Sequence, residues 1–406
     1  MSRFQCIADR CEDNCCGDWR LQVDEPSFVK LRTRMTDAGA TNEFAEKVIL
    51  RGDRGVFAEL ALTADGSCSF RDEKKLCSVQ NRFGEPTIPT ACAVYPRHVN
   101  QLGERTELSG AFSCPEVARL ALGAEDAMSL DDFLPETLSR DHRARVLAPS
   151  VGDAYSYFLD DVRSAVIRIL ARRDYPLTTR LAMCAQFASA VGGFFYRDCG
   201  AANDELKHKL ARELAAVEQG DVWTQVHEQF TAYEAPGEST VTFVASMFVS
   251  RLELPHSPRF RALVERVLAT YGGRGLELPP PAKLWETYQA RRDRLETHFG
   301  AEIERYFQNY CTQFWFRNWY TESDNLQIHN RTLFIRLAAI RLLLVGHPDV
   351  TPMLDGPGDL FPIAVEVFQT FVRSVEHEVE FLKIVHQAQS AGGDPFARAL
   401  LLLKGF

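Results

Sequence analysis

The sequence Cys6-Ile7-Ala8-Asp9-Arg10-Cys11-Glu12-Asp13-Asn14-Cys15-Cys16 brings four thiols into one short segment near the start of the chain. Four more cysteines follow at wider spacing, namely Cys68, Cys77, Cys92 and Cys114. The chain has eleven cysteines in 406 residues, and the remaining three are scattered: Cys184, Cys199 and Cys311. No apolar run follows basic residues at the beginning, so we expect no secretory signal. Because thiols in a reducing compartment seldom form disulfides, this crowding predicts a metal centre.

The donors of the predicted centre are mostly thiolates. Cys11 and Cys15 have a spacing found in zinc sites, but no second short-spaced pair follows, and His98 is the only histidine before residue 126. An all-thiolate set suits a [4Fe–4S] cluster at least as well as zinc. The candidate metal ligands are Cys6, Cys11, Cys15, Cys16, Cys68, Cys77, Cys92 and Cys114. The alternative is that several of them are small buried hydrophobic residues. Because the neighbours Cys15 and Cys16 point in different directions in a regular backbone, we expect one of them to be a ligand and the other to pack beside the site.

Beyond about residue 131 the apolar residues recur at three- and four-residue spacing, which is typical of amphipathic helices. Such stripes run from Tyr155 to Leu170, from Leu333 to Leu343 and from Ile363 to Val379. Leu278-Pro279-Pro280-Pro281 predicts a break and a helix that starts at or just after the prolines. Val56–Leu60 could be a strand or a helical turn. We therefore predict a mainly α fold: a small Cys-rich metal-binding module at 1–125, then a large all-helical body at 126–406 with a subdivision near 277–282.

Composition narrows the functional classes. Hydrophobic residues make up 46% and charged residues 25% of the chain, the balance of a folded globular protein. A net charge of -9 argues against nucleic-acid binding as the primary role. The longest apolar stretch, 333–346, contains Arg336 and Arg341 and is too short to span a membrane. We expect a cytoplasmic monomer without a nucleic-acid or membrane partner.

Several segments together resemble the flagellin lysine N-methylase family. The segments that carry the resemblance are Phe4-Gln5-Cys6, Cys11 to Trp19, Cys68 to Glu85, Cys92-Ala93-Val94-Tyr95-Pro96-Arg97, Leu108 to Glu116, Ile303 to Tyr310 and Phe371 to His377. The resemblance implies methyl transfer from S-adenosylmethionine to lysine side chains of flagellin. It also implies an iron–sulfur or zinc centre in the cysteine module.

Methyl transfer to lysine requires a neutral amine aligned with the sulfonium methyl group, and a group that takes up the ammonium proton. Tyr95, Glu376 and His377 are the candidate catalytic residues, and Glu376-His377 is alternatively a surface or interhelical pair. The candidate cofactor-binding residues are Trp19, Arg97 and Tyr310. Arg97 could bind the carboxylate of the cofactor or form a structural ion pair.

Aromatic residues crowd 306–320, and they form either a wall of the cofactor or lysine pocket or simply a buried helix. No G-x-G-x-x-G motif follows a strand, so a doubly wound cofactor domain is not expected. The radical-type cysteine loop is also absent, so we expect polar displacement with a structural metal. The alternative function is a metal-chelating or redox protein, or a helical binding protein held by zinc, without methyltransferase activity.

Overall fold

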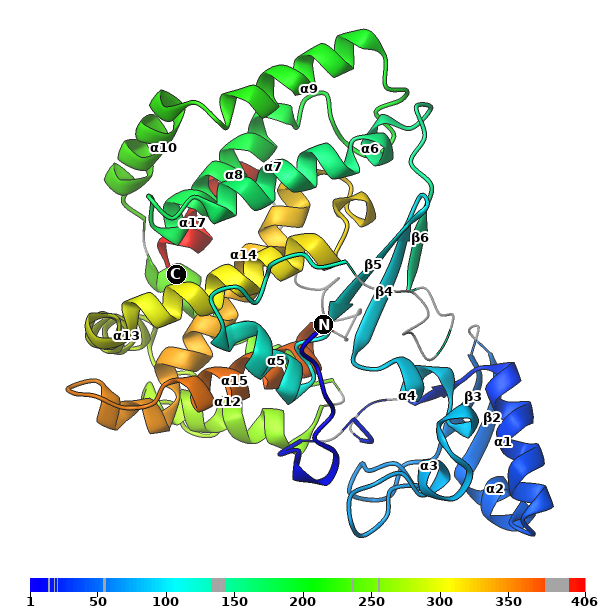
Figure 1. Cartoon of the computed structure of the whole chain (residues 1–406). Helices are drawn as coiled ribbons and strands as arrows, with labels where there is room; N and C mark the ends of the chain where they lie inside the picture. Colours follow the sequence, from blue (N-terminus) through cyan, green and yellow to red (C-terminus); the bar gives the residue numbers. More distant parts are fainter. Residues whose placement is uncertain are drawn as a thin grey trace. The chain divides into compact units, whose positions relative to one another are not determined.

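The computed structural model (Figure 1) divides the chain into two compact units, each of which is described by itself. The structure describes residues 1–13, 15–17, 19, 21–53, 56–132, 140, 144–235, 237–254, 256–376 and 394–405. The cysteine unit comprises Met1–Gln101, Arg105–Leu120 and Leu130–Val146, and it contains all eight cysteines of the N-terminal segment. The helical unit comprises Leu102–Glu104, Ala121–Ser129 and Leu147–Phe406. Within the described ranges, no helix is long and apolar enough to cross a membrane.

The first part of the cysteine unit is a small sheet covered by two helices. A 3₁₀ turn, η1 (Ala8–Arg10), precedes β1 (Gln22–Val23), α1 (Glu25–Asp37), α2 (Thr41–Lys47), β2 (Val48–Asp53) and β3 (Val56–Leu60). The strands are antiparallel in the order β1-β3-β2, so Val56–Leu60 is the central strand. Asp24 begins α1, because its carboxylate accepts a hydrogen bond from the Ser27 backbone N–H at 2.9 Å.

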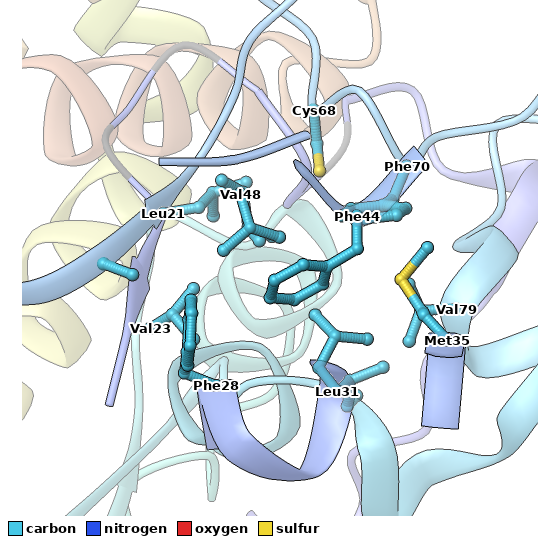
Figure 2. Close-up of a cluster of buried hydrophobic side chains, with 13 residues drawn as sticks. Leu21, Val23, Phe28, Leu31, Met35, Phe44, Val48, Cys68, Phe70 and Val79 are labelled. Atoms are coloured by element: carbon cyan, nitrogen blue, oxygen red, sulfur yellow. The ribbon is translucent and has the colours of Figure 1, made fainter. Parts of the chain in front are cut away.

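A hydrophobic cluster holds this part of the unit together (Figure 2). The apolar face of α1 supplies Phe28, Leu31 and Met35, and the rings of Phe28 and Phe44 meet edge to face at 5.2 Å. Complete burial of a side chain such as Leu31 contributes about 1.5–3 kcal/mol. Cys68 is a member of the same cluster, so the core fixes the position of one thiol directly.

The rest of the cysteine unit alternates short helices with a second sheet. Its elements are α3 (Ser78–Phe83), η2 (Glu85–Thr87), α4 (Thr90–Val94), β4 (Arg97–Leu102), β5 (Arg105–Gly110), α5 (Pro115–Gly123) and β6 (Arg145–Leu147). The strand order is β5-β4-β6. Strand β6 lies inside the range predicted to be all helical, so that part of the prediction is wrong. The pairing of β4 with β6 joins segments that are far apart in the sequence, as the hydrogen bond from Ala144 N–H to Val99 O at 2.7 Å shows. The local periodicity of the sequence cannot predict such a pairing.

The helical unit consists mainly of α-helices (Figure 1). They are α6 (Ala154–Tyr157), α7 (Leu159–Ala171), α8 (Leu177–Val191), α9 (Asp204–Ala216), α10 (Gly220–Ala232), α11 (Gly237–Arg251), α12 (Pro258–Thr270), α13 (Pro281–Arg317), α14 (Leu326–Gly346), α15 (Phe361–Phe371) and α17 (Pro395–Lys404). The short turns η4 (Tyr320–Glu322) and η5 (Pro348–Met353) join some of them, and a π-helical turn, η6 (Val372–Glu376), follows α15. The predicted mainly α fold is confirmed.

Individual helices follow the sequence patterns closely. The stripe from Tyr155 to Leu170 is buried, but it is split into α6 and α7 because Phe158 leaves helical geometry, with φ -90° and ψ 16°. Helix α13 begins at Pro281, as the proline run predicts. It changes direction at Phe299, whose φ of -129° and ψ of 17° are not helical. Helix α14 is buried on nearly every side and is the centre of the unit.

Candidate functional site

Six thiols of the cysteine unit gather around a seventh, that of Cys15. Burial is the largest cause of the raised pKa at five of these six thiols; at Cys16 a hydrogen bond with Cys15 is the largest cause and burial the next. In all six cases the charge of Cys15 raises the pKa further, so its sulfur lies within electrostatic reach of the others. The six are Cys11, Cys16, Cys68, Cys77, Cys92 and Cys114.

Backbone pairing explains part of this convergence. The Cys68 N–H donates a hydrogen bond to the carbonyl of Cys16 at 2.6 Å, and Gly17 forms a bridge with Ser67. Cys77 precedes α3 and forms a bridge with Arg71. These contacts draw the first cysteine loop onto the loop that carries the next two thiols.

The residues present fit a thiolate-bound metal. Buried thiolates that repel one another are unfavourable unless a cation is shared between them, and metal binding releases the thiol protons. The donors are also soft sulfurs, which favour zinc and iron–sulfur clusters. Among the described residues, no three histidine, cysteine, aspartate or glutamate side chains are already arranged to coordinate a metal ion. The metal therefore stays a prediction at this point.

Two of the predicted site residues lie beside the thiol loops. The Trp19 indole N–H donates to the carbonyl of Cys15 at 3.1 Å, and its ring meets the Tyr95 ring edge to face at 5.0 Å. The Tyr95 hydroxyl lies 3.2 Å from the hydroxyl of Ser113, the residue before Cys114. Trp19 and Tyr95 are thus brought together and connect two cysteine segments.

Arg97, the predicted carboxylate-binding residue, is half-buried. Its guanidinium lies over the ring of Phe4, 5.4 Å from the ring centroid. This contact joins the beginning of β4 to the N-terminal segment.

The helical unit brings together a second pair of predicted site residues, Tyr310 on α13 and Glu376 at the end of η6. The Tyr310 hydroxyl donates a short hydrogen bond to Glu376 Oε1. Arg336 of α14 places Nη1 3.3 Å from the same oxygen, and Arg317 places Nη1 3.9 Å from Oε2. We call these four residues the buried ionic site. His377 lies outside the described residues.

Burial dominates the electrostatics of the buried ionic site. The side chains of Glu376, Arg336 and Arg317 are only 8%, 10% and 11% exposed. Burial, and next the charge of Glu376, raise the pKa of Tyr310 well above its usual value, so the phenol keeps its proton and donates it. The Arg336 guanidinium also lies 5.1 Å from the ring centroid of Phe314. The arrangement holds a carboxylate among cations and aromatic rings, away from water.

Residues 163–402, more than half of the chain, match the model of the FliB lysine N-methylase C-terminal domain. The chain belongs to this family. The matched FliB segment contains all four residues of the buried ionic site, whereas the clustered thiols precede it.

Curated relatives agree with the assignment to the FliB family. The Lysine-N-methylases of Salmonella typhimurium and Salmonella choleraesuis are each 28% identical over 133 residues, which is 32% of this chain and 33% of theirs. The flagellar biosynthetic protein FliU of Salmonella muenchen is 27% identical over 133 residues, which is 79% of its length. The chain therefore matches about a third of the length of the two Lysine-N-methylases. No solved structure matches.

Two residues of the buried ionic site were not anticipated in this FliB-family chain: Arg317 and Arg336. A signal for Arg336 was available, because it interrupts an otherwise apolar stretch in the sequence. An arginine buried in a protein interior is almost always paired. Its partner, however, lies 40 residues away along the chain and could not be inferred from the spacing.

Proposed function

We propose that this chain transfers methyl groups from S-adenosylmethionine to lysine side chains of flagellin. The observation that carries the proposal is the match of 163–402 to the FliB lysine N-methylase domain. The names of the relatives support both the reaction and the flagellar context. The substrate, the methyl donor and the metal centre are parts of this proposal.

The proposed chemistry is a polar displacement. The lysine nitrogen forms a bond to the methyl carbon while the carbon–sulfur bond breaks, and S-adenosylhomocysteine leaves with the electron pair. The attacking amine must first lose its ammonium proton, which requires a base or a route to water. Closely held reactants in a desolvated pocket account for most of the acceleration.

Within the helical unit, Glu376 and Tyr310 are the residues that we assign to this step. Their arrangement follows from the contacts: Tyr310 and Arg336 both reach Oε1 of Glu376 and fix the orientation of its carboxylate. The rings of Tyr310 and Phe368, which meet at 5.5 Å, offer faces that favour a sulfonium or a methylated ammonium. In the cysteine unit, we assign Tyr95 as a catalytic candidate.

The same proposal gives the cysteine unit a metal centre and cofactor contacts. Trp19 and Arg97 are the residues of the cysteine unit that we propose as cofactor-binding residues, and Tyr310 keeps that proposed role within the helical unit. A bound [4Fe–4S] cluster, or zinc as the alternative, would supply a rigid link between loops that have little apolar surface of their own. The thiols that would hold it are among Cys15 and the six thiols gathered around it.

The test is a methylation assay with the anaerobically purified full chain, labelled S-adenosylmethionine and a candidate flagellin. Mass spectrometry would locate methylated lysines and count the added groups. Glu376→Gln and Tyr95→Phe are the informative variants, and Glu265→Gln, which changes a surface ion pair, is the matched control. Methylated lysine in the wild type and control, with a loss of at least tenfold in the Glu376 variant, is expected.

Two results would oppose the proposal. No methyl transfer to any flagellin by metal-loaded protein would remove the function itself. Production of 5′-deoxyadenosine, together with a requirement for a one-electron reductant, would keep the methyl transfer but replace the polar mechanism.

A further inference from the structure

We propose that one region of the helical unit's surface is the docking surface for lysine-bearing segments of the protein substrate. The segments 151–161, 194–200 and 320–325 form this region, which we call the aromatic–acidic surface. The inference deepens the proposed function and rests on it, because it states how the protein substrate of that reaction is held. It concerns recognition of the substrate chain and not of the methyl donor.

Backbone hydrogen bonds fasten the three segments to one another. The Ala154 N–H donates to the carbonyl of Gly200 at 2.8 Å, which joins the first segment to the second. The Arg197 N–H donates to the carbonyl of Asp324 at 2.8 Å, which joins the second segment to the third. The segment 194–200 therefore contacts both of the others, and the side chains of all three belong to one region of the helical unit.

Buried aromatic rings support the aromatic–acidic surface from within the unit. The Tyr320 hydroxyl donates to the carbonyl of Tyr155 at 2.9 Å, and the ring of Tyr155 lies 5.1 Å from that of Phe195. Phe158 connects this base to the outside, because its ring lies 6.4 Å from that of Phe195 and 5.0 Å from that of Tyr157. Since the backbone is already fixed by these contacts, a partner does not have to order it on binding.

The exposed apolar side chains of the helical unit are concentrated here. Val151, Tyr157 and Tyr196 are 59%, 40% and 43% exposed. Among the described residues of this unit, no other large hydrophobic side chain is exposed to that degree. Single exposed apolar residues are ordinary on a protein surface, but apolar side chains that gather in one region indicate a binding surface.

The same three segments are strongly acidic. They contain six acidic residues and one basic residue, Arg197, whose guanidinium pairs with Asp324 at 3.1 Å. The net charge of the whole chain is -9, so these short segments carry more than half of it. The acidic residues, all of them exposed except the half-buried Asp160, are Asp153, Asp160, Asp161, Asp198, Glu322 and Asp324.

This combination of side chains fits a lysine-bearing segment. The ammonium group of lysine is attracted by carboxylates, and also by the face of a tyrosine ring within about 6 Å of its centroid. The four-carbon stem of lysine is apolar and can cover Val151, Tyr157 or Tyr196 while the charge stays in water. A surface of opposite charge also speeds the encounter with a cationic partner. A protein that is methylated on lysine presents such side chains to the enzyme.

The charge of the aromatic–acidic surface opposes other occupants. Two copies of the chain related by a two-fold axis would place the same carboxylates against one another, and like charges that face each other across an interface are unfavourable. Nucleic acids and anionic lipid surfaces carry negative phosphates and would be repelled in the same way. A cationic segment of the protein substrate is therefore the occupant to which we commit.

The test measures binding and catalysis separately, with the full chain and one candidate flagellin. Calorimetry without a methyl donor gives the affinity for flagellin, and a methylation assay gives KM and kcat. Tyr157→Ala combined with Tyr196→Ala should weaken binding and raise KM by roughly tenfold, because aromatic side chains dominate such interfaces. The kcat and the affinity for S-adenosylmethionine should stay unchanged. Tyr233→Ala, outside the three segments, is the control and should bind flagellin as the wild type does.

A second variant isolates the contribution of charge. Asp161→Asn combined with Asp198→Asn removes two exposed carboxylates, and asparagine suits position 198, whose φ of 65° lies in the left-handed region. The affinity for flagellin should fall about three- to tenfold at low salt and much less at about 0.5 M salt, where charges are screened. Asp293→Asn combined with Asp355→Asn removes the same charge elsewhere in the unit, from side chains 62% and 76% exposed, and should bind like the wild type.

Three outcomes would overturn the inference. The first is wild-type affinity and KM in the tyrosine variant while the wild type methylates flagellin, which leaves the proposed function standing. The second is a wild-type chain that does not bind flagellin. The third is a wild-type dimer in sedimentation that the tyrosine variant abolishes, which makes a second copy the occupant. Binding that depends on the aromatic–acidic surface without any methylation supports the docking surface and refutes the proposed function.

Should the tyrosine variant fail to fold, hydrogen–deuterium exchange of the wild-type chain decides the question. Slower exchange at 151–161 or 194–200 after addition of flagellin supports the docking surface. Protection confined to other segments refutes it.

Discussion

Replacing Glu376 by glutamine should destabilise the helical unit strongly. The carboxylate is the acidic partner of Arg336 and Arg317, and it accepts the hydrogen bond from Tyr310. Glutamine has nearly the same shape and still offers one oxygen as an acceptor. The change therefore removes the negative charge and leaves most of the packing in place.

The expected magnitude follows from burial. Because Arg336 and Glu376 are both about nine-tenths buried, removing one partner leaves a charge without compensation at a cost of about 3–5 kcal/mol. The hydrogen bond to Tyr310 is retained in part, so it adds little. A loss of this size lowers the melting temperature of a unit of this length by roughly 6–20 °C.

Urea unfolding followed by circular dichroism would measure this loss. Glu265→Gln is the matched control, because Glu265 pairs with Arg261 one helical turn away on a partly exposed surface. Its loss should stay near 0.3–0.5 kcal/mol. Arg336→Met combined with Glu376→Gln should cost less than the sum of the single changes, since neither charge is then left alone. A loss below about 1 kcal/mol for Glu376→Gln, or strict additivity, would refute the reasoning.

Three further outcomes are expected. Tyr310→Phe should lose about 1.5–3 kcal/mol, the contribution of a hydrogen bond to a charged group, and an unchanged urea midpoint would contradict it. The free energy of unfolding of the metal-free chain should fall as the pH rises from about 9 towards 12. The Cys114 thiol has a raised pKa in the folded chain, so the unfolded chain loses this proton at a lower pH, and rising pH therefore favours unfolding. Cys114→Ser should flatten that dependence in urea titrations. Burial lowers the pKa of His347, so the native state binds fewer protons, and stability should fall as pH drops below about 6.5. His347→Gln should weaken this dependence of stability on acidic pH. A pH profile identical to that of the wild type would show that His347 is not its cause.

Local patterns in the sequence were sufficient for most of the helices. The stripe that ends at Leu170 is buried as its spacing indicates, because a helix with one apolar face must place that face against a core. The three prolines before α13 likewise fix where the helix starts, since proline is tolerated only in the first turn. The pairing of the strands could not be predicted from local sequence patterns. Val56–Leu60 was equally compatible with a helical turn, and its role as the central strand depends on partners on both sides.

The candidate sites show the same difference between features that the local sequence predicts and contacts that only the fold creates. The crowding of thiols was visible, because four of them lie within eleven residues, but their convergence around Cys15 depends on contacts between distant segments, such as the hydrogen bond between Cys68 and Cys16. In the helical unit, Tyr310 and Glu376 were chosen separately from different motifs. The fold brings them into contact through the π-helical turn at the end of α15, a feature that is often found at functional sites.

Two arginines of α14 differ in how deeply their acidic partners are buried. Arg341 forms a close ion pair with Glu296, whose side chain is 38% exposed, so water still solvates part of that carboxylate. The side chain of Glu376 is 8% exposed, so its carboxylate is almost completely desolvated where it pairs with Arg336. Such a pair gains little stability over apolar residues of similar size, so stability alone does not account for its presence. The double variant of Arg336 and Glu376 separates the two roles, because it can fold while it lacks the charges. If it regains stability without regaining methyl transfer, the charges serve the reaction; if methyl transfer returns with stability, they serve only the fold.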